Sequence, residues 1–131
     1  MSEFSKSLDV SASGLKAQSQ RLRHVSENIA NTDTPGYRRK TVAFKTVFDG
    51  TRDGAGRVET GRVRLDRSDL EQVYDPAHPM ADETGHYQGS NVDLIIEIAD
   101  AREAQRSYDA NLKMFDQARQ MSSSLMDLLR R

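Results

Sequence analysis

Residues 30–37 read ANTDTPGY, and this stretch decides where the first helix ends and a different kind of structure begins. Asn31 can adopt the left-handed conformation that ends a helix, and Thr34 is pushed into an extended conformation by the proline after it. Pro35 fixes φ at the second position of a turn, and Gly36 accepts a positive φ at the third. A phosphate-binding loop would need Gly-x4-Gly-Lys-Ser/Thr between a strand and a helix. The stretch therefore predicts a turn.

Glycine and proline divide the chain of 131 residues into three segments. All three prolines and seven of the eight glycines lie in residues 35–89, so the sequences on either side contain almost no helix breakers. This distribution predicts an N-terminal coiled-coil helix in residues 1–31 and a C-terminal coiled-coil helix in residues 91–131. Residues 32–90 are expected to form a loop and a small β-containing insert.

Residues of the first segment recur with the 4-3 spacing of a coiled-coil seam. Two polar residues occupy seam positions and Gly14 lies between them, which weakens the first half of this helix in the absence of a partner. The alternate seam positions are Phe4, Ser11, Gln18 and Val25. The apolar residues proposed for helix packing lie at intervals of seven: Leu8, Leu15, Leu22 and Ile29.

The last segment repeats the pattern, with two successive steps of three residues from Leu112 to Ala118. Asn91 or Ser90 is the expected N-cap, and Asp93 lies in the first turn at the positive end of the helix dipole. The predicted seam residues are Leu94, Ile98, Ala101, Gln105, Tyr108, Leu112, Phe115, Ala118, Ser122, Leu125 and Leu129.

These patterns predict a mainly α fold, in which long N- and C-terminal helices form an elongated coiled-coil hairpin with a small β-containing insert. Tyr108, Leu112, Phe115 and Leu125 are expected to pack against the leucines of the first helix, in the same chain or in a neighbouring one. At about 1.5 Å per residue, the second helix outruns the first. Its uncovered apolar stripe is either a surface for other chains or the frayed end of a monomeric hairpin, and the periodicity fits both.

The insert contains two runs with β-strand alternation on either side of a glycine-rich stretch. Residues 41–48 read TVAFKTVF, which places Val42, Phe44 and Thr46 on one face. Residues 56–66 read GRVETGRVRLD, and the two Asp-Gly pairs in residues 49–56 are typical of a hairpin or an open loop. Residues 74–87 read YDPAHPMADETGHY and are expected to form a solvated loop.

Charge is divided within the insert although the whole chain has a net charge of only -1. Residues 38–67 hold nine basic and four acidic side chains, whereas residues 68–83 hold five acidic and no basic ones. Opposite patches favour head-to-tail contact between copies, which builds rings or helical filaments. They could equally neutralise each other within one chain.

Composition argues against several kinds of site. The chain has no cysteine, so disulfides, thiolate metal sites and thiol nucleophiles are excluded. His78 and His86 lie near carboxylates, but in a segment without a scaffold to fix ligand geometry, so no metal site is expected. No nucleophile elbow and no pair of carboxylates in an apolar stretch is present, so no catalytic residue, cofactor or small-molecule substrate is predicted.

Two further features bear on location and partners. Tyr37 precedes three basic residues, but no nucleic-acid-binding motif accompanies them, so a surface cluster is expected and no nucleic-acid partner. The first residues lack the basic region and apolar run of a Sec signal, and no stretch approaches a membrane span. The chain is expected to be cytoplasmic or to leave the cytoplasm by a route that reads no such signal.

Three stretches in order resemble the flagellar basal-body rod protein family, and within it the small proximal-rod subunits. They are SGLKAQSQRLRHVSENIANTDTPGYRRKTVAF, VYDPAHPMADETGHY and SNVDLIIEIADAREAQRSYDANLKMFDQARQM. The short TDTPG loop and Ser90, where a proline is usual, depart from the family pattern. The matching residues are Asn28, Ala30, Asn31 and Tyr37, then Tyr74, Pro76, Pro79, Ala81, Asp82 and Gly85, then Asn91, Val92, Glu97, Arg106, Ser107, Tyr108 and Asn111.

The resemblance implies a noncatalytic building block that is exported unfolded through the flagellar type III apparatus, without a cleaved signal peptide. It implies assembly with itself and other rod proteins into the periplasm-spanning rod of the basal body, which transmits motor torque to the hook. The alternatives are the other type of small proximal-rod subunit and a cytoplasmic helical regulator or chaperone of export. The expected turn motif is Asn28, Ala30, Asn31, Thr32, Pro35, Gly36 and Tyr37, and the candidate subunit contacts are Arg38, Arg39, Lys40, Asp75, Asp82, Glu83, Arg106 and Asn111.

Overall fold

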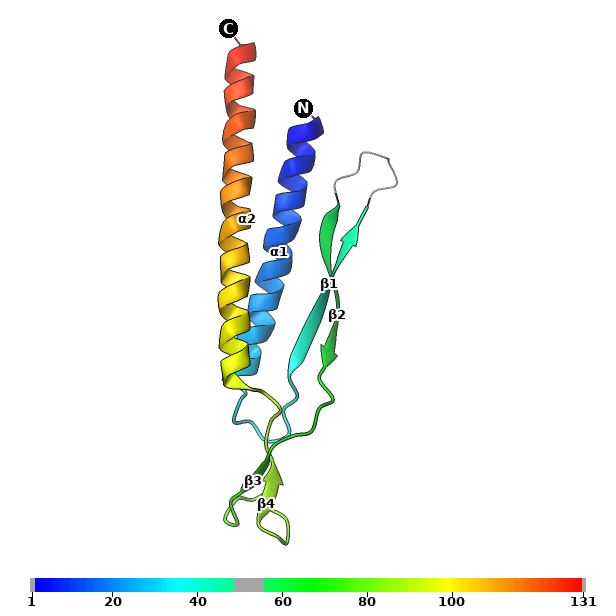
Figure 1. Cartoon of the computed structure of the whole chain (residues 1–131), viewed down its shortest axis with the longest axis vertical. Helices are drawn as coiled ribbons and strands as arrows, with labels where there is room; N and C mark the ends of the chain where they lie inside the picture. The colour runs from blue at the N-terminus through cyan, green and yellow to red at the C-terminus, as the bar shows by residue number, and fades with distance from the viewer. Residues whose placement is uncertain (1, 49–55, 131) are drawn as a thin grey trace.

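The chain forms an elongated, mainly α structure with a small antiparallel β insert (Figure 1). The computed structural model describes residues 2–48 and 56–130. In chain order the elements are α1 (Ser2–Ala30), β1 (Lys40–Val47), β2 (Arg57–Leu65), β3 (Gln72–Tyr74), β4 (His86–Gln88) and α2 (Leu94–Leu129). The two helices run antiparallel, the β1–β2 hairpin lies alongside α1, and the β3–β4 hairpin projects at the end opposite the two termini. Of the helices described, neither is long and apolar enough to cross a membrane.

The helix ends differ in detail from those expected. Asp93 is the N-cap of α2, because its Oδ1 accepts a hydrogen bond of 3.0 Å from Ile95 N. The expected caps serve elsewhere: Ser90 donates to Thr32 O, and Asn91 Oδ1 accepts from Arg39 N. No non-glycine residue among those described has positive φ, so the left-handed conformation expected at the end of α1 is wrong.

Small and polar residues line the contact between α1 and α2. A Cβ atom at Gly14 would lie 2.9 Å from Asn111 Oδ1, which shows how closely the helices approach there. The α1 residues buried along this seam are Ser11, Gly14, Val25 and Asn28. Buried or half-buried residues follow an unbroken 4-3 spacing on α2: Glu97, Ala101, Ala104, Tyr108, Asn111, Phe115, Ala118 and Ser122.

The predicted phase of the seam is therefore wrong by one residue at half of its positions. Leu112 and Leu125 are 40% and 42% exposed, so they do not pack into the seam of their own chain, and no double step of three residues occurs. Leu8, Leu15, Leu22 and Ile29 are only half-buried. Small residues allow a close approach, and the polar ones bond to the insert, so these interactions override the apolar stripe in setting the phase.

A β-bulge interrupts the alternation of side chains in the β1–β2 hairpin. Val42 pairs with Val63 and Phe44 pairs with Thr60, so one extra residue of β2 lies between these pairs. The bulge moves Val63 onto the face of Thr60, whereas simple alternation places them on opposite faces. The antiparallel pairing itself is confirmed, and the predicted connection in residues 49–55 lies outside the described residues.

The segment expected to be a loop is closed by a second hairpin: its two ends pair as β3 and β4, which the prediction missed, while residues 75–85 between them form turns. Val73 pairs with Tyr87, and Asp75 N donates to Gly85 O at 2.9 Å, where Gly85 has a φ of 84°. The rings of His78 and Tyr87 stack with centroids 3.9 Å apart. The strands have only three residues each, too few to produce a recognisable period.

Candidate functional site

A cluster of hydrogen-bonded polar side chains connects the end of α1 to the insert, and Asn28 lies at its centre. We call this cluster the polar joint. Asn28 is 1% exposed. Its Oδ1 accepts hydrogen bonds from Tyr37 OH at 2.8 Å and from Lys40 N at 2.9 Å. Its Nδ2 donates to Lys40 O at 2.9 Å and to Glu97 Oε2 at 3.3 Å. An asparagine side chain can form two donor and two acceptor bonds, so all four bonds of Asn28 are used: two with the backbone of Lys40, one with Tyr37 and one with Glu97.

Glu97 brings α2 into the same joint. Its side chain is fully buried and accepts a hydrogen bond from Arg39 Nε as well as the one from Asn28. The same guanidinium donates from Nη2 to Asp100 Oδ2 at 2.9 Å. A buried carboxylate is tolerated only when it is paired and hydrogen-bonded. The bonds of Glu97 therefore fix Glu97, Arg39 and Asn28 relative to one another.

The turn after α1 attaches to the second hairpin. Tyr37 N donates to Thr34 O at 3.2 Å, and Gly36 has a φ of 74°, so the predicted turn with Pro35 and Gly36 in its middle positions is confirmed. Gly36 N lies 3.1 Å from Gln88 O and 3.0 Å from Gly89 O. Burial raises the pKa of the Tyr37 phenol, which therefore keeps its proton and donates to Asn28. The motif thus sets the direction in which the insert leaves the helices.

Several candidate subunit contacts are used within the chain. Arg39 belongs to the polar joint, and Lys40 Nζ lies 2.7 Å from Glu27 Oε2. Asn111 is half-buried against Gly14 and donates to Ser107 O at 2.9 Å. Arg39, Lys40 and Asn111 thus have partners within their own chain, and their contacts with other subunits stay a prediction. The remaining candidates are Arg38, which bonds to the backbone of residues 66 and 68, and the exposed residues Asp75, Asp82, Glu83 and Arg106.

The sequence-based prediction overlooked Glu97 as a structural partner of the turn. A signal was present, because Glu97 is the only charged residue of the run LIIEIA and lies in the first turn of α2. A lone carboxylate in an apolar helical run indicates a paired group. Its partner Arg39 is 58 residues away in the sequence, so only the folded chain identifies it.

Acid is expected to destabilise the chain, because several carboxylates, Glu27 and Asp66 among them, are held ionised in the folded state. A hydrogen bond from Lys40 lowers the pKa of Glu27 from its ordinary value of 4.5. Hydrogen bonds from Ser68 lower the pKa of Asp66 from its ordinary value of 3.8. The unfolded chain then binds more protons than the folded one, so the stabilisation is complete above the ordinary pKa values and is lost as the pH falls through the lowered ones.

Thermal unfolding followed by circular dichroism measures this effect. The melting temperature should change little between about pH 7 and about pH 5 and should fall below that range. The variant Glu27→Gln should show a shallower fall, because it removes one of these groups. A melting temperature that rises on acidification would contradict the assignment.

The leucines predicted for the seam form a separate surface beside it. Leu15, Leu22 and Ile29 each follow a seam position of α1 by one residue, which rotates them by about 100° from the contact with α2. Residues that precede a seam position face the other way, as Ser13 does in accepting from Val58 N at 3.1 Å. The leucines therefore lie on the face opposite β2.

The second helix contributes to the same surface. Ile98 and Leu112 follow seam positions of α2 by one residue, and in an antiparallel pair such positions lie on the same side as those of α1. They are 41% and 40% exposed. We call this surface the outer helical face, and its residues are Leu8, Leu15, Leu22, Ile29, Leu94, Ile98 and Leu112.

An elongated helical hairpin with a thin core and an uncovered apolar face is typical of subunits that complete their packing against other chains. The buried apolar residues among those described are only Ala17, Val25, Ala104 and Ala118. Within the same described part, His, Asp and Glu side chains form no group of three or more that could hold a metal ion. The fold and this surface define the chain as a structural subunit of an assembly.

Comparisons with known proteins identify the family. Residues 8–38 match the model of the flagella basal body rod protein family, and residues 83–128 match that of the flagellar basal body rod FlgEFG protein C-terminal family. The flagellar basal-body rod protein FlgC of Agrobacterium fabrum is 47% identical over 99% of this chain and 98% of its own length. FlgC of Bacillus subtilis is 34% identical over 93% of this chain and 95% of its own, and FlgC of Salmonella typhimurium 32% over 92% and 93%. The chain therefore belongs to the flagellar basal-body rod protein family, in its FlgC-type branch.

Proposed function

We propose that the chain is a structural subunit of the proximal rod of the flagellar basal body. Similarity to FlgC proteins along nearly the whole chain carries this proposal. The subunit joins copies of itself and other rod proteins in a helical assembly, which transmits motor torque to the hook. Its role is noncatalytic, and it acts by the shape and stiffness of its packed elements.

The outer helical face is the proposed contact for neighbouring helices. Leu22 and Leu112 are large apolar residues that the chain's own α1–α2 seam does not bury. Helices from adjacent subunits would cover them and form a coiled coil around the rod axis. The C-terminal turns of α2 extend beyond the start of α1, and Leu128 and Leu129 there are 64% and 79% exposed. This overhang extends the apolar contact surface.

Export through the flagellar type III apparatus as an unfolded chain, without a cleaved signal peptide, is the proposed route to the rod. The thin core supports it, because apolar burial contributes about 25 cal/mol per Å² and small residues such as Ala17 and Ala104 bury little area. A chain stabilised mainly by its neighbours costs little to unfold before export and gains its order on assembly.

Location discriminates this function from its alternatives. Purified hook–basal bodies from a strain that expresses the chain with an epitope tag should contain it, and deletion of its gene should abolish motility. A regulator or chaperone of export would stay cytoplasmic and be absent from these particles. A chain of the FlgB type would instead replace FlgB in complementation and would fail to replace FlgC. Absence of the chain from the particles would contradict the proposal.

A further inference from the structure

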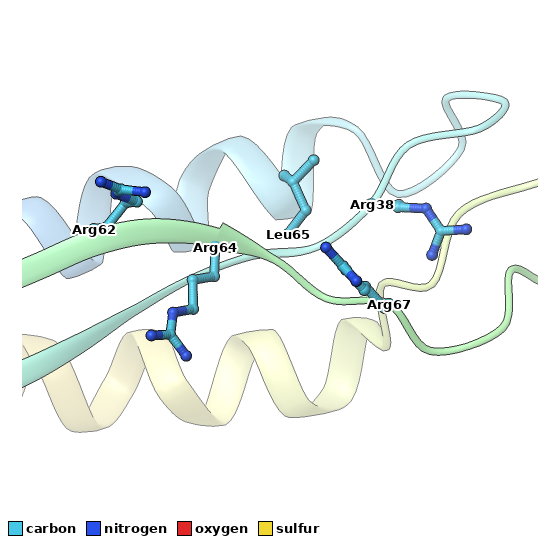
Figure 2. A pocket seen from close by; sticks show the side chains of 5 residues that line it. All are labelled: Arg38, Arg62, Arg64, Leu65 and Arg67. Carbon is cyan, nitrogen blue, oxygen red and sulfur yellow. The ribbon is translucent and has the colours of Figure 1, made fainter.

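Four arginines surround an open hollow at the side of the insert. Arg62 and Arg64 extend from β2, while Arg38 and Arg67 lie at the other end of the hollow, and Leu65 lies among them (Figure 2). The hollow has a volume of about 890 Å³. We call these five residues the arginine socket.

Most of the charge of the socket has no ion-pair partner in the part of the chain that the structure describes. Among residues 2–48 and 56–130, no carboxylate forms an ion pair with Arg62, Arg64 or Arg67. Arg38 donates only to the backbone oxygens of Asp66 at 3.3 Å and Ser68 at 3.1 Å. The carboxylate of Asp66, whose pKa is lowered by hydrogen bonds from Ser68 and further by the charges of Arg39 and Arg38, offsets part of the charge of Arg38. Within the described residues, the unpaired charge of the socket is therefore carried mainly by Arg62, Arg64 and Arg67. A cluster of like charges destabilises a chain by mutual repulsion unless an anionic partner approaches it.

A matching acidic surface lies at the turns of the β3–β4 hairpin. We call it the acidic tip, and its carboxylates are Asp75, Asp82 and Glu83. Asp82 Oδ1 accepts hydrogen bonds from Thr84 N at 2.9 Å and from His86 N at 3.1 Å. The Thr84 hydroxyl lowers the pKa of Asp82, which keeps this carboxylate ionised. The turn is thus held rigid before any contact forms, which reduces the entropy lost on binding.

The two surfaces also complement each other in apolar area. Leu65 is 54% exposed within the socket, and on the hairpin of the tip Tyr74 is 67% exposed and Met80 is 63% exposed. An apolar centre with a charged rim is the usual composition of a specific interface. The exposed leucine of the socket and the exposed methionine and tyrosine of the hairpin therefore support a contact between the two surfaces, in addition to their opposite charges.

The tip projects from the far end of the molecule, whereas the socket lies beside β2 (Figure 1). In the described part of the chain no ion pair joins an arginine of the socket to a carboxylate of the tip. Internal neutralisation, one of the two alternatives left by the sequence, is therefore not observed between these two surfaces. A chain with two complementary surfaces at different places forms head-to-tail contacts, which generate rings or helices.

We propose that the arginine socket receives the acidic tip of a second copy of this chain. The proposal deepens the proposed rod function and rests on it, because it names the partner of one surface. The contact is heterologous: each copy offers its tip to one neighbour and its socket to another. It lies on the insert and is distinct from the outer helical face, so the two contacts can be disrupted separately.

Disulfide trapping tests the contact in assembled particles. The chain has no cysteine of its own, so the variants Arg67→Cys and Glu83→Cys each carry a single thiol. Hook–basal bodies from cells that express both variants should yield a disulfide-linked dimer, and cells that express either one alone should not. Pairing Glu83→Cys with Arg23→Cys is the control, since Arg23 is 79% exposed and lies outside the socket.

Charge exchange provides the second test. Arg67→Glu and Glu83→Arg should each lower incorporation of the chain into basal bodies by on the order of tenfold, because like charges would meet across the contact. The double variant should restore incorporation, since it recreates opposite charges in every copy. Arg23→Glu, with the same charge change at an exposed position, should leave incorporation unchanged.

The outcomes separate this proposal from the proposed function. Particles that contain the cysteine variants but no dimer would overturn the head-to-tail contact and leave the rod function intact. A loss caused by Arg67→Glu that Glu83→Arg does not share would overturn the second copy as partner and indicate an acidic partner of another kind. If the double variant is incorporated no better than either single variant, the second copy as partner is overturned as well. If the unmodified chain were absent from the particles, the rod function would fail as well.

Discussion

A chain that carries Leu22→Asp is expected to remain folded and to be absent from the rod. Leu22 is half-buried at the centre of the outer helical face, so an aspartate there places a charge where a neighbouring helix would pack. Burying an unpaired carboxylate at such a contact costs several kcal/mol, which corresponds to a loss of about a thousandfold or more in association. Because the side chain lies outside the α1–α2 seam, the effect on the isolated chain should be about 1 kcal/mol.

The measurements are motility on soft agar, the amount of the variant in hook–basal bodies and the helix content of the purified chain. Arg23→Asp is the matched control, because it introduces the same side chain one residue away at a position that is 79% exposed. The control should swim. If Leu22→Asp also supports rod formation and swimming, the outer helical face is not an assembly surface.

Asn28→Asp is expected to produce the largest loss of stability in the folded chain. The substitution replaces a donor with an acceptor, so the bonds to Lys40 O and Glu97 Oε2 are lost and two carboxylates face each other. An unpaired buried charge costs about 3–5 kcal/mol. Natural domains are stable by only about 5–15 kcal/mol, so a thin-cored chain should be largely unfolded by this change.

Urea unfolding followed by circular dichroism measures this loss, and Asn31→Asp is its control. Asn31 is only half-buried and donates one side-chain bond, to Glu27 O at 2.8 Å, so the same exchange there should cost about 1 kcal/mol or less. The deficit of Asn28→Asp should shrink as the pH is lowered towards about 5, because a protonated aspartic acid can donate again. Equal losses in the two variants would show that the joint does not depend on Asn28.

Local features of the sequence predicted the parts of the fold that depend on neighbouring residues. The concentration of glycine and proline in the middle of the chain predicted two long helices around an insert. Pro35 and Gly36 predicted the turn between them, because both residues restrict or permit particular φ values regardless of what packs around them. The alternation in residues 41–48 predicted β1 for the same kind of reason.

Features that depend on contacts between distant residues were predicted less well. The bulge in β2 and the short strands β3 and β4 each involve a pairing partner that local alternation does not identify. The seam of the helices was predicted in the wrong phase at half of its positions, since a 4-3 spacing fits two adjacent phases when apolar, small and polar residues are interleaved. Leucines at intervals of seven made the wrong phase the more apolar of the two.

The sequence by itself determined the order of helix, insert and helix, the turn that separates them and the division of charge within the insert. Only the tertiary structure decided which face of each helix is used inside the chain. Asn28 and Glu97 form a buried hydrogen-bonded pair with the start of the insert, and Gly14 allows close approach, so the seam follows these residues. The leucines that a coiled coil would bury internally are thereby turned outward, since unsatisfied buried polar groups cost more than half-exposed leucines.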